Sequence, residues 1–357
     1  MIIKFVPGFE SIIGQKQPIR ILATLLQRGT IPHAMLFCGI DTAGKRTAAM
    51  TFAMSSNCLN RPVPTVQSVT PLCLAVDGSF DAVNPCRDCI SCRKILSDNH
   101  PDILNISPSG AIIRIAQIRA LCESLSMKPY EARRRFVIIS EAQTMNLEAG
   151  NALLKLLEEP PDRTIFILLA TQASDLLPTI ASRCQHVHFY PLPRKELQTL
   201  LLEKENLPPD DTGVIAVLAN GDYAKALAYS RPFKGTDWNH WRNWLLDASG
   251  LKQPGELSQR PVGLKLMFAE QLAANKEILL DALEVLKAWL RDLVIFKYSP
   301  EKIINTDLVD TIRNVSQTES VSTLILKIET IQTAQKSIRG NSNARLTLEA
   351  MMLKMGC

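Results

Sequence analysis

The segment from Gly39 to Lys45 reads G-I-D-T-A-G-K, which has the glycine and lysine spacing of a phosphate-binding loop. Such a loop follows a buried strand and opens a helix, because its backbone N–H groups close around phosphate oxygens at the helix N-terminus. The flanks fit this order: residues 34–37 form a short apolar run, and residues 46–54 (RTAAMTFAM) are helix-prone. The sequence therefore predicts a P-loop α/β fold.

The loop is altered at the position that normally binds metal. Arg46 follows Lys45 where a Ser or Thr hydroxyl would hold Mg²⁺, and a guanidinium cannot ligate a cation. Thr42 stands where an additional glycine is usual, which makes the loop less free to wrap a phosphate. Thr47 comes one residue late, and on a helix this turns its hydroxyl by roughly 100°. We expect weak or absent binding of ATP and Mg²⁺ through the candidate nucleotide contacts Gly39, Gly44, Lys45, Arg46 and Thr47.

A second element of the nucleotide site is also altered. The apolar run at residues 136–139 predicts a buried parallel strand, whose end normally carries the carboxylates that hold Mg²⁺ and activate water. Ser140 takes the place of the first carboxylate, and only Glu141 remains. Both departures predict little or no ATPase activity. The three arginines at 133–135, just before the strand, predict a solvated turn, with a phosphate contact as the alternative.

Length and composition restrict the class of protein. At 357 residues the chain is too long for one small core, which predicts two or three domains. Hydrophobic residues make up 46% and charged residues 21% of the chain. No apolar stretch approaches the roughly 20 residues that cross a bilayer, so we expect a cytoplasmic protein without a membrane partner. The net charge of +5 permits contact with nucleic acid but does not argue for it.

The chain has nine cysteines, and in a cytoplasmic protein they suggest metal binding rather than disulfides. Cys86, Cys89 and Cys92 form C-x₂-C-x₂-C, a spacing that lets thiolates converge on one tetrahedral zinc ion. A fourth ligand is expected from Cys58, at the end of the helix after the P-loop. Cys73, in a Pro-, Val- and Ser-rich stretch, is the alternative, because loop-closure entropy changes little with loop length. Buried thiols without metal are the competing interpretation.

The remaining pattern predicts three domains. A further β-rich run at residues 164–171 indicates a parallel sheet of at least three buried strands alternating with helices. Leu192-Pro193 marks a linker, and strand signals vanish beyond residue 233. We expect long amphipathic helices at 278–298, 321–338 and 344–355. The predicted limits are 1–187 for the P-loop domain with its zinc-binding insertion, 188–232 for a small helical domain and 233–357 for a helical oligomerisation domain.

Several motifs, taken in order, resemble those of the bacterial clamp-loader subunits of DNA polymerase III. They are the altered P-loop, the cysteine cluster, His100-Pro101-Asp102, Ser140-Glu141-Ala142, Asn151-Ala152-Leu153-Leu154-Lys155, Leu157-Glu158-Glu159-Pro160-Pro161 and Ser182-Arg183-Cys184. The resemblance is strong over the first 190 residues and weaker over the rest, where residues 341–353 look like the last helix of the family's collar. It implies an α/β fold: an AAA+ P-loop parallel sheet with a helical lid and a C-terminal all-α collar domain.

Within this family, the gamma and tau motor subunits have an intact P-loop with a Thr after the Lys, and an acidic pair after the second strand. The present chain departs at both places. It therefore resembles the delta-prime type of subunit, which completes the ring and usually does not hydrolyse ATP. The family's third nucleotide contact, a lid arginine, would fall at Ala224, beside Lys225.

The resemblance also implies a mechanism and partners. A five-subunit ring opens a sliding clamp and places it on primer-template DNA, with each ATP site between two subunits. Arg183 would act in trans on the γ-phosphate of a neighbouring gamma or tau subunit, and such an arginine contributes roughly 10³ to 10⁵ in rate. An interfacial salt bridge is the alternative role for Arg183. The delta subunit is a further expected partner, and the clamp and DNA are reached through the complex.

Two other functions remain open at this stage. One is an ATP-hydrolysing gamma- or tau-type motor subunit, in which Thr47 or a water replaces the missing metal ligand. The other is a zinc-stabilised DNA-binding or regulatory protein.

Overall fold

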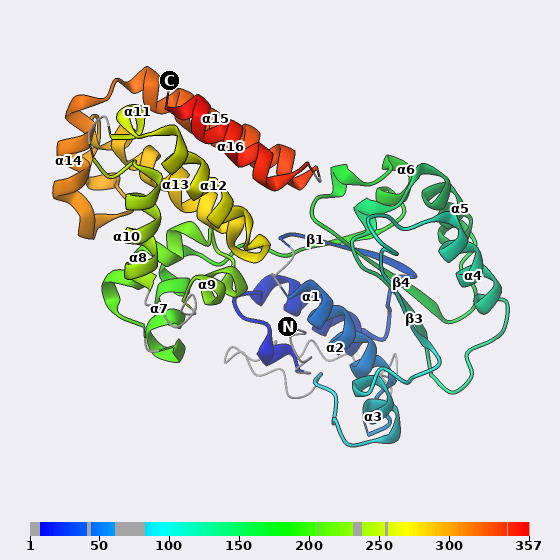
Figure 1. Cartoon of the computed structure of the whole chain (residues 1–357). Helices are drawn as coiled ribbons and strands as arrows, with labels where there is room; N and C mark the ends of the chain where they lie inside the picture. Colours follow the sequence, from blue (N-terminus) through cyan, green and yellow to red (C-terminus); the bar gives the residue numbers. More distant parts are fainter. Residues whose placement is uncertain are drawn as a thin grey trace. The chain divides into compact units, whose positions relative to one another are not determined.

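The chain divides into two compact units, Met1–Pro191 and Leu192–Cys357 (Figure 1). The computed structural model describes residues 8–40, 44–60, 83–205, 207–230, 238–253, 256–340 and 342–356. Thr42 and Cys73 lie outside these ranges. A further division of the second unit into a lid and a collar at residue 232 stays a prediction.

The first unit is built on a five-stranded parallel sheet with the strand order β2-β3-β4-β1-β5. Its three central strands contain the apolar runs of the sequence: β1 (Ala34–Cys38), β3 (Arg135–Ile139) and β4 (Thr164–Ala170). Every residue of these strands is buried, as in sheets that are covered on both faces. The outer strands β2 (Ile103–Ile106) and β5 (Gln185–His188) are less buried. The predicted parallel α/β sheet is confirmed.

Helices cover both faces of this sheet (Figure 1). One face carries α1 (Lys16–Arg28), α2 (Lys45–Asn57) and α3 (Ile90–Leu96), and the other carries α4 (Ile115–Leu125), α5 (Leu147–Glu158) and α6 (Pro178–Ala181). Single 3₁₀ turns are η1 (Phe9–Ser11), η3 (Ala142–Thr144) and η4 (Ala173–Asp175). Strand alternation divides the core: Phe37 packs toward α2, whereas Leu36 packs toward α5. Helix α5 begins where the Asn146 side chain accepts the Ala149 N–H at 3.0 Å.

The arginines at 133–135 are held inside the first unit. Arg135 is 5% exposed, and its guanidinium lies 3.4 Å from the Asp102 carboxylate, which is 1% exposed. Asp102 also accepts three backbone N–H groups from residues 130–132, each at 2.8 Å. Burial alone would raise the pKa of Asp102, but these donors and Arg135 outweigh it and lower that pKa. The predicted solvated turn is therefore wrong. Asp102 binds the backbone of residues 130–132 and the guanidinium of Arg135, and so forms a buried polar network with them.

In the described part of the second unit, every regular element is a helix. The elements are α7 (Arg194–Glu205), α8 (Pro209–Leu218), α9 (Tyr223–Ser230), α10 (Trp238–Ser249), α11 (Glu256–Gln259), α12 (Val262–Ala273), α13 (Lys276–Phe296), η5 (Pro300–Lys302), η6 (Thr306–Leu308), α14 (Val309–Thr318), α15 (Val321–Arg339) and α16 (Ala344–Met355). The three predicted long helices correspond to α13, α15 and α16. The predicted fold class is confirmed, a P-loop parallel sheet followed by an all-helical C-terminal part. No helix in the described ranges is both long and apolar enough to span a membrane.

A buried polar network fastens α10 to α13. Asp292 on α13 is fully buried and accepts the backbone N–H groups of Ile304 and Asn305 at 2.9 and 2.8 Å. Arg242 on α10 is 1% exposed, forms an ion pair with Asp307 and donates to the Asn305 side chain at 3.0 Å. These contacts tie the turn at residues 304–307 to both helices, so the unit has its own internal framework.

Candidate functional site

The predicted P-loop lies between β1 and α2, where the sequence placed it. Gly39 adopts φ 148°, and a Cβ there would overlap the Phe189 carbonyl oxygen, so no other residue fits without movement. Gly44 adopts φ 81° and is the N-cap of α2. Residues 41–43, between the two glycines, lie outside the described residues. Both described glycines of the loop thus adopt backbone conformations that favour glycine.

Lys45 is turned into the protein. It is 3% exposed, and its ammonium donates to the carbonyl oxygens of Gly39 and of Ala170, the latter at 2.8 Å. Gly39 directly follows the strand β1, and Ala170 is the last residue of the strand β4. A P-loop lysine binds phosphate at this carboxyl end of the parallel strands. The next residue, Arg46, is exposed, and Thr47 is half-buried. The side chain at the metal-ligand position therefore reaches into solvent and offers no oxygen.

The end of β3 carries no buried carboxylate. The Ser140 N–H donates to the Ile106 carbonyl at 2.8 Å, which continues the pairing of β3 with β2. Glu141 is exposed and adopts φ 50°. Its carbonyl accepts the Thr144 N–H at 2.8 Å in the turn η3. Ser140 and Glu141 thus stand where a motor ATPase needs an acidic pair.

Arg183 lies in the short connection between α6, which ends at Ala181, and the strand β5, which begins at Gln185. Its guanidinium forms an ion pair with Glu158 at 2.6 Å and donates to the Thr179 carbonyl at 2.9 Å. The side chain remains 37% exposed, and that of Glu158 is 50% exposed. Glu158 ends the apolar helix α5, where an acidic residue usually only meets solvent, so the sequence alone indicates no partner for it. The structure makes it the intramolecular partner of Arg183.

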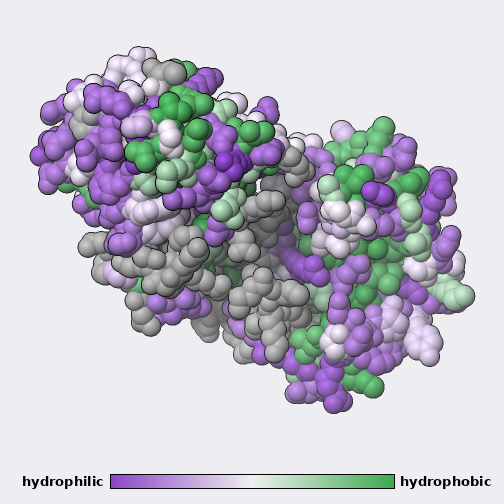
Figure 2. Space-filling model, in the orientation of Figure 1, coloured by the Kyte–Doolittle hydropathy of each residue, from purple (hydrophilic) through white to green (hydrophobic). Residues whose placement is uncertain are grey.

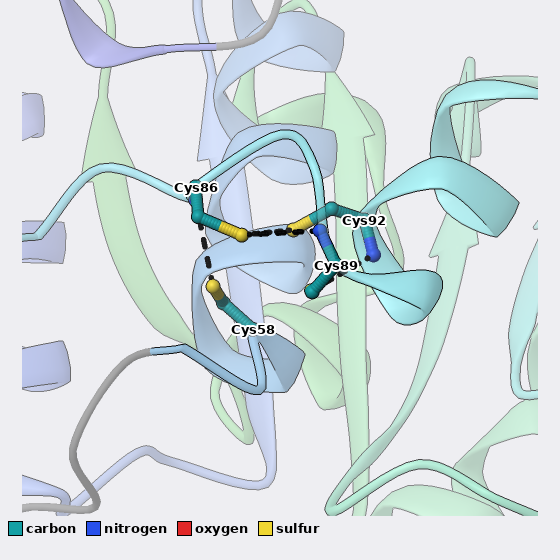
Figure 3. A group of neighbouring side chains, drawn as sticks. All are labelled: Cys58, Cys86, Cys89 and Cys92. Carbon is teal, nitrogen blue, oxygen red and sulfur yellow. Dashed lines mark hydrogen bonds between the residues drawn. The ribbon is translucent and has the colours of Figure 1, made fainter.

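Four cysteines meet beside α2 (Figure 3). Cys58 follows the last residue of α2, Cys89 caps the N-terminus of α3, and Cys92 lies in its first turn. Cys86 completes the group, and the four sulfur atoms all lie within 4.8 Å of one another. Cys86 and Cys92 have their sulfurs 3.9 Å apart, close to the roughly 3.8 Å edge of a tetrahedron with Zn–S bonds of about 2.3 Å. The residues present therefore fit a tetrahedral metal ion.

Backbone donors favour thiolates in this cluster. The N–H groups of Cys86, Cys89 and Cys92 point to the sulfurs of Cys58, Cys86 and Cys89 at 3.4, 3.3 and 3.5 Å. Burial opposes ionisation of Cys89, but N–H donors from Cys92 and Leu59 prevail and lower its pKa to about 6. Burial raises the pKa of Cys58 and of Cys92. A bound cation would compensate the charge of four crowded thiolates.

The cluster is linked to the sheet and to the P-loop helix. Arg133, in the turn before β3, donates to the Cys58 carbonyl at 3.2 Å. Asn57, the last residue of α2, donates to the Arg134 carbonyl at 2.9 Å and accepts its N–H at 3.0 Å. The sequence pattern did not indicate these links, because the partners are about 75 residues apart.

Ala224 occupies the position where the family resemblance predicts a lid arginine. Ala224, at the second position of α9, carries no charge, and the neighbouring Lys225 has its ammonium 4.0 Å from the Asp281 carboxylate. The same ammonium lies 5.5 Å from the centre of the Tyr229 ring. Lys225 is thereby engaged inside the second unit.

Comparison with known proteins yields two family matches. A family described as DNA polymerase III, delta subunit matches residues 14–193, and one described as DNA polymerase III, delta subunit, C terminal matches residues 264–356. The DNA polymerase III subunit delta' of Bacillus subtilis (strain 168) is 29% identical over 348 residues, which cover 96% of each chain. The DNA polymerase III subunit tau of the same organism is 25% identical over 97% of this chain and 61% of that longer protein. A solved gamma subunit-related protein from Thermotoga maritima superposes with a TM-score of 0.42 and 20% identity, covering 96% of this chain and 98% of that one.

Proposed function

The chain belongs to the DNA polymerase III delta-subunit family, among the clamp-loader subunits related to gamma and tau, and from this premise we propose that it is the delta-prime subunit of the clamp loader. In this role it loads the sliding clamp onto primed DNA, in the cytoplasm, as one member of a ring with gamma or tau and delta. The observation that carries the proposal is the exposed Arg46 directly after Lys45, which denies the P-loop its metal-ligating hydroxyl.

The nucleotide site of this chain is proposed to be degenerate. Lys45 and the loop glycines still offer phosphate contacts, which allow weak nucleotide binding. Hydrolysis needs more, because Mg²⁺ and the attacking water must both be held. Arg46 and Ser140 supply neither, so the chain has little or no ATPase activity of its own.

Arg183 is proposed as an arginine finger for the neighbouring ATPase subunit. It follows the short helix α6 at the edge of the sheet, and its side chain is partly exposed. Its pair with Glu158 is solvent-accessible on both sides, and such pairs contribute only about 0–1 kcal/mol. A γ-phosphate, with more negative charge and several acceptor oxygens, competes well for the same guanidinium.

The cysteine cluster is proposed to hold a structural zinc ion through Cys58, Cys86, Cys89 and Cys92. All four ligands are protein thiols, which leaves no open position for catalysis. The ion would clamp the end of α2 to the start of α3. It would thus support the helix that begins with the P-loop.

Residues 233–357, within the second unit, are proposed to form the oligomerisation collar, and residues 188–232 are proposed to form a small helical lid. Large apolar side chains stay exposed on α12 and α16: Val262, Leu264, Met267, Leu346 and Leu353. Figure 2 shows apolar residues among hydrophilic ones on the outside of this unit. Clustered exposed apolar side chains are typical of surfaces that pack against another chain.

Reconstitution tests this proposal. The full chain is mixed with a gamma-type motor subunit and with delta, and the complex is isolated on a sizing column. We expect co-migration in one assembly and little turnover by the chain alone. An isolated chain that hydrolyses ATP at the rate of a motor subunit, or that never joins the assembly, would contradict the proposal.

The role of Arg183 is tested on the purified assembly, with the other ATP sites inactivated. Arg183→Ala should preserve co-migration and lower hydrolysis at the adjacent site by about 10³-fold or more. Arg163→Ala is the matched control, because Arg163 is 68% exposed in a surface pair of the same unit. Undiminished hydrolysis at the adjacent site in the Arg183→Ala assembly would rule out the arginine finger.

A further inference from the structure

Strand β2 is the outermost strand on one side of the sheet, so only one of its edges is paired. The Phe136 N–H donates to the Asp102 carbonyl at 2.9 Å, and the Ser140 N–H donates to the Ile106 carbonyl at 2.8 Å. Alternate residues of a parallel strand turn their amide groups to the same neighbour. The backbone N–H and C=O groups of Leu104 and Ile106 therefore face β3. Those of Asn105 point away from the sheet.

A groove of about 540 Å³ runs beside this outer edge, between β2 and α4. Leu104 and Ile106 contribute apolar side chains from β2, and Leu121 contributes one from α4. The Gln117 side chain donates to the Ser107 carbonyl at 2.8 Å and so closes the end of the edge beyond Asn105. The groove thus combines an apolar wall with a short stretch of free strand edge.

One exposed carboxylate, that of Asp98, lies beside the same edge on the other face of the sheet. The Asn105 side chain donates to the Asp98 carboxylate at 2.9 Å, and Asp98 is exposed and lines the groove. Within the described residues, no Lys or Arg forms an ion pair with Asp98. Because side chains alternate along a strand, Asn105 and Asp98 lie on the other face from Leu104. A strand that pairs with Asn105 would meet an apolar wall on one face and a carboxylate on the other.

We propose that the outer edge of β2 binds an extended peptide segment of a partner protein. Backbone hydrogen bonds to Asn105 hold the segment, as in other cases where a peptide adds a strand to a sheet edge. Its side chains alternate between aliphatic residues, which enter the groove beside α4, and Lys or Arg residues, which meet Asp98. Strand β2 is at one side of the sheet, and β5, which comes after Arg183 in the chain, is at the other. The peptide site therefore shares no residue with the proposed arginine finger, and the proposal does not depend on the clamp-loader role.

The test uses the full chain and a fluorescein-labelled synthetic peptide of alternating lysine and valine, with binding followed by fluorescence anisotropy. Asn105→Pro removes the outward N–H without touching the bonds to β3, since proline is tolerated at an outer edge. Asn105→Ala is the matched control, because it loses the same side chain and keeps the N–H. We expect Asn105→Ala to bind within about threefold of the wild type and Asn105→Pro to bind at least tenfold more weakly.

Two further measurements separate pairing from general attraction. Ala120 is an exposed residue of α4 that lines the groove. Ala120→Trp should fill the groove without altering β2, and it should weaken binding to the same extent as Asn105→Pro. Amide hydrogen exchange should slow at residues 103–107 when the peptide is added. A peptide N-methylated at alternate residues should not bind, and Asp98→Asn should weaken the lysine peptide several-fold. No saturable binding at millimolar peptide, or equal affinity for Asn105→Pro and Asn105→Ala, would overturn the proposal.

Discussion

The ion pair between Arg183 and Glu158 decides how available the arginine is to another chain. Both side chains are at least one third exposed, and their charged atoms lie 2.6 Å apart. An exposed pair of this kind contributes about 0–1 kcal/mol, so Glu158 competes weakly for the guanidinium. In the free chain the pair holds Arg183 near α5, and in an assembly a γ-phosphate would replace the carboxylate.

Removing that competitor should speed hydrolysis in the neighbour. Glu158→Gln releases up to about 1 kcal/mol, so turnover at the adjacent site of the assembled complex should rise by up to about fivefold. Glu159→Gln is the control, because Glu159 is exposed and next in sequence. A fall in turnover for Glu158→Gln alone would show instead that Glu158 positions the arginine.

Asp102 is a buried carboxylate that binds Arg135 and the backbone of residues 130–132 in the first unit. Asp102→Asn should lower the free energy of unfolding of that unit by about 3 kcal/mol at pH 7, because Arg135 loses its counter-charge. Urea unfolding measures the change. Asp162→Asn, in an exposed pair, should have almost no effect and serves as control. Equal stability of Asp102→Asn and the wild type would contradict the buried ion pair.

The same residue predicts a pH dependence. The folded pKa of Asp102 lies below its unfolded value of about 3.9, so its stabilisation is fully present above about pH 4. That contribution is lost as the pH falls through the folded pKa. The wild type should therefore lose more stability below about pH 4 than Asp102→Asn does.

At the scale of elements, helix α2 connects the two chemical centres of the first unit. It begins at the P-loop with Lys45 and ends next to Cys58. The cysteine spacing indicated Cys86, Cys89 and Cys92 as candidate ligands because they lie before and within the first turn of one short helix, α3. Spacing cannot select the fourth ligand, because closing a long loop costs little more than closing a short one. The structure brings Cys58 to the other three.

Zinc content tests the assignment of the ligands. Protein purified without chelator should hold about one zinc ion per chain, and Cys58→Ser should hold markedly less. Cys73→Ser should keep its zinc, and so should Cys184→Ser, which changes a buried thiol of the opposite core. Chelation should also speed amide hydrogen exchange in α3 and in the last turn of α2. Absence of zinc from the wild type would refute the site.

The elements also show which parts of the fold a sequence can reveal. Strands β1, β3 and β4 are covered on both faces, so their apolar runs are unbroken and easily recognised. The outer strands β2 and β5 carry Asn105 and two exposed histidines, and neither has an apolar run. Asp102 and Glu158 act through partners distant in sequence. Such roles follow only from tertiary structure.

At the scale of the whole molecule, the candidate functional residues lie in the first unit, which contains the altered P-loop sequence, Arg183 and the four cysteines. The described part of the second unit is a helical framework held by Arg242 and Asp292. On the proposal that Arg183 serves a nucleotide bound by another subunit, the chain acts through an assembly. Activity measured on the isolated chain is therefore a test of the whole assignment.

Restoring the missing hydroxyl should not by itself create a motor. The isolated chain is expected to show little or no ATP turnover, and Arg46→Thr should at most tighten nucleotide binding, since the hydroxyl restores only the metal ligand. Ser140 still leaves the end of β3 without its first carboxylate, and an isolated chain has no neighbour to donate an arginine. Nucleotide affinity and turnover are measured on the wild type, on Arg46→Thr and on Arg46→Thr with Ser140→Asp, with Lys45→Ala as the control that abolishes phosphate contact. Motor-like turnover in the wild type, abolished by Lys45→Ala, would mean that Thr47 or water already holds the metal and that the chain is a motor subunit.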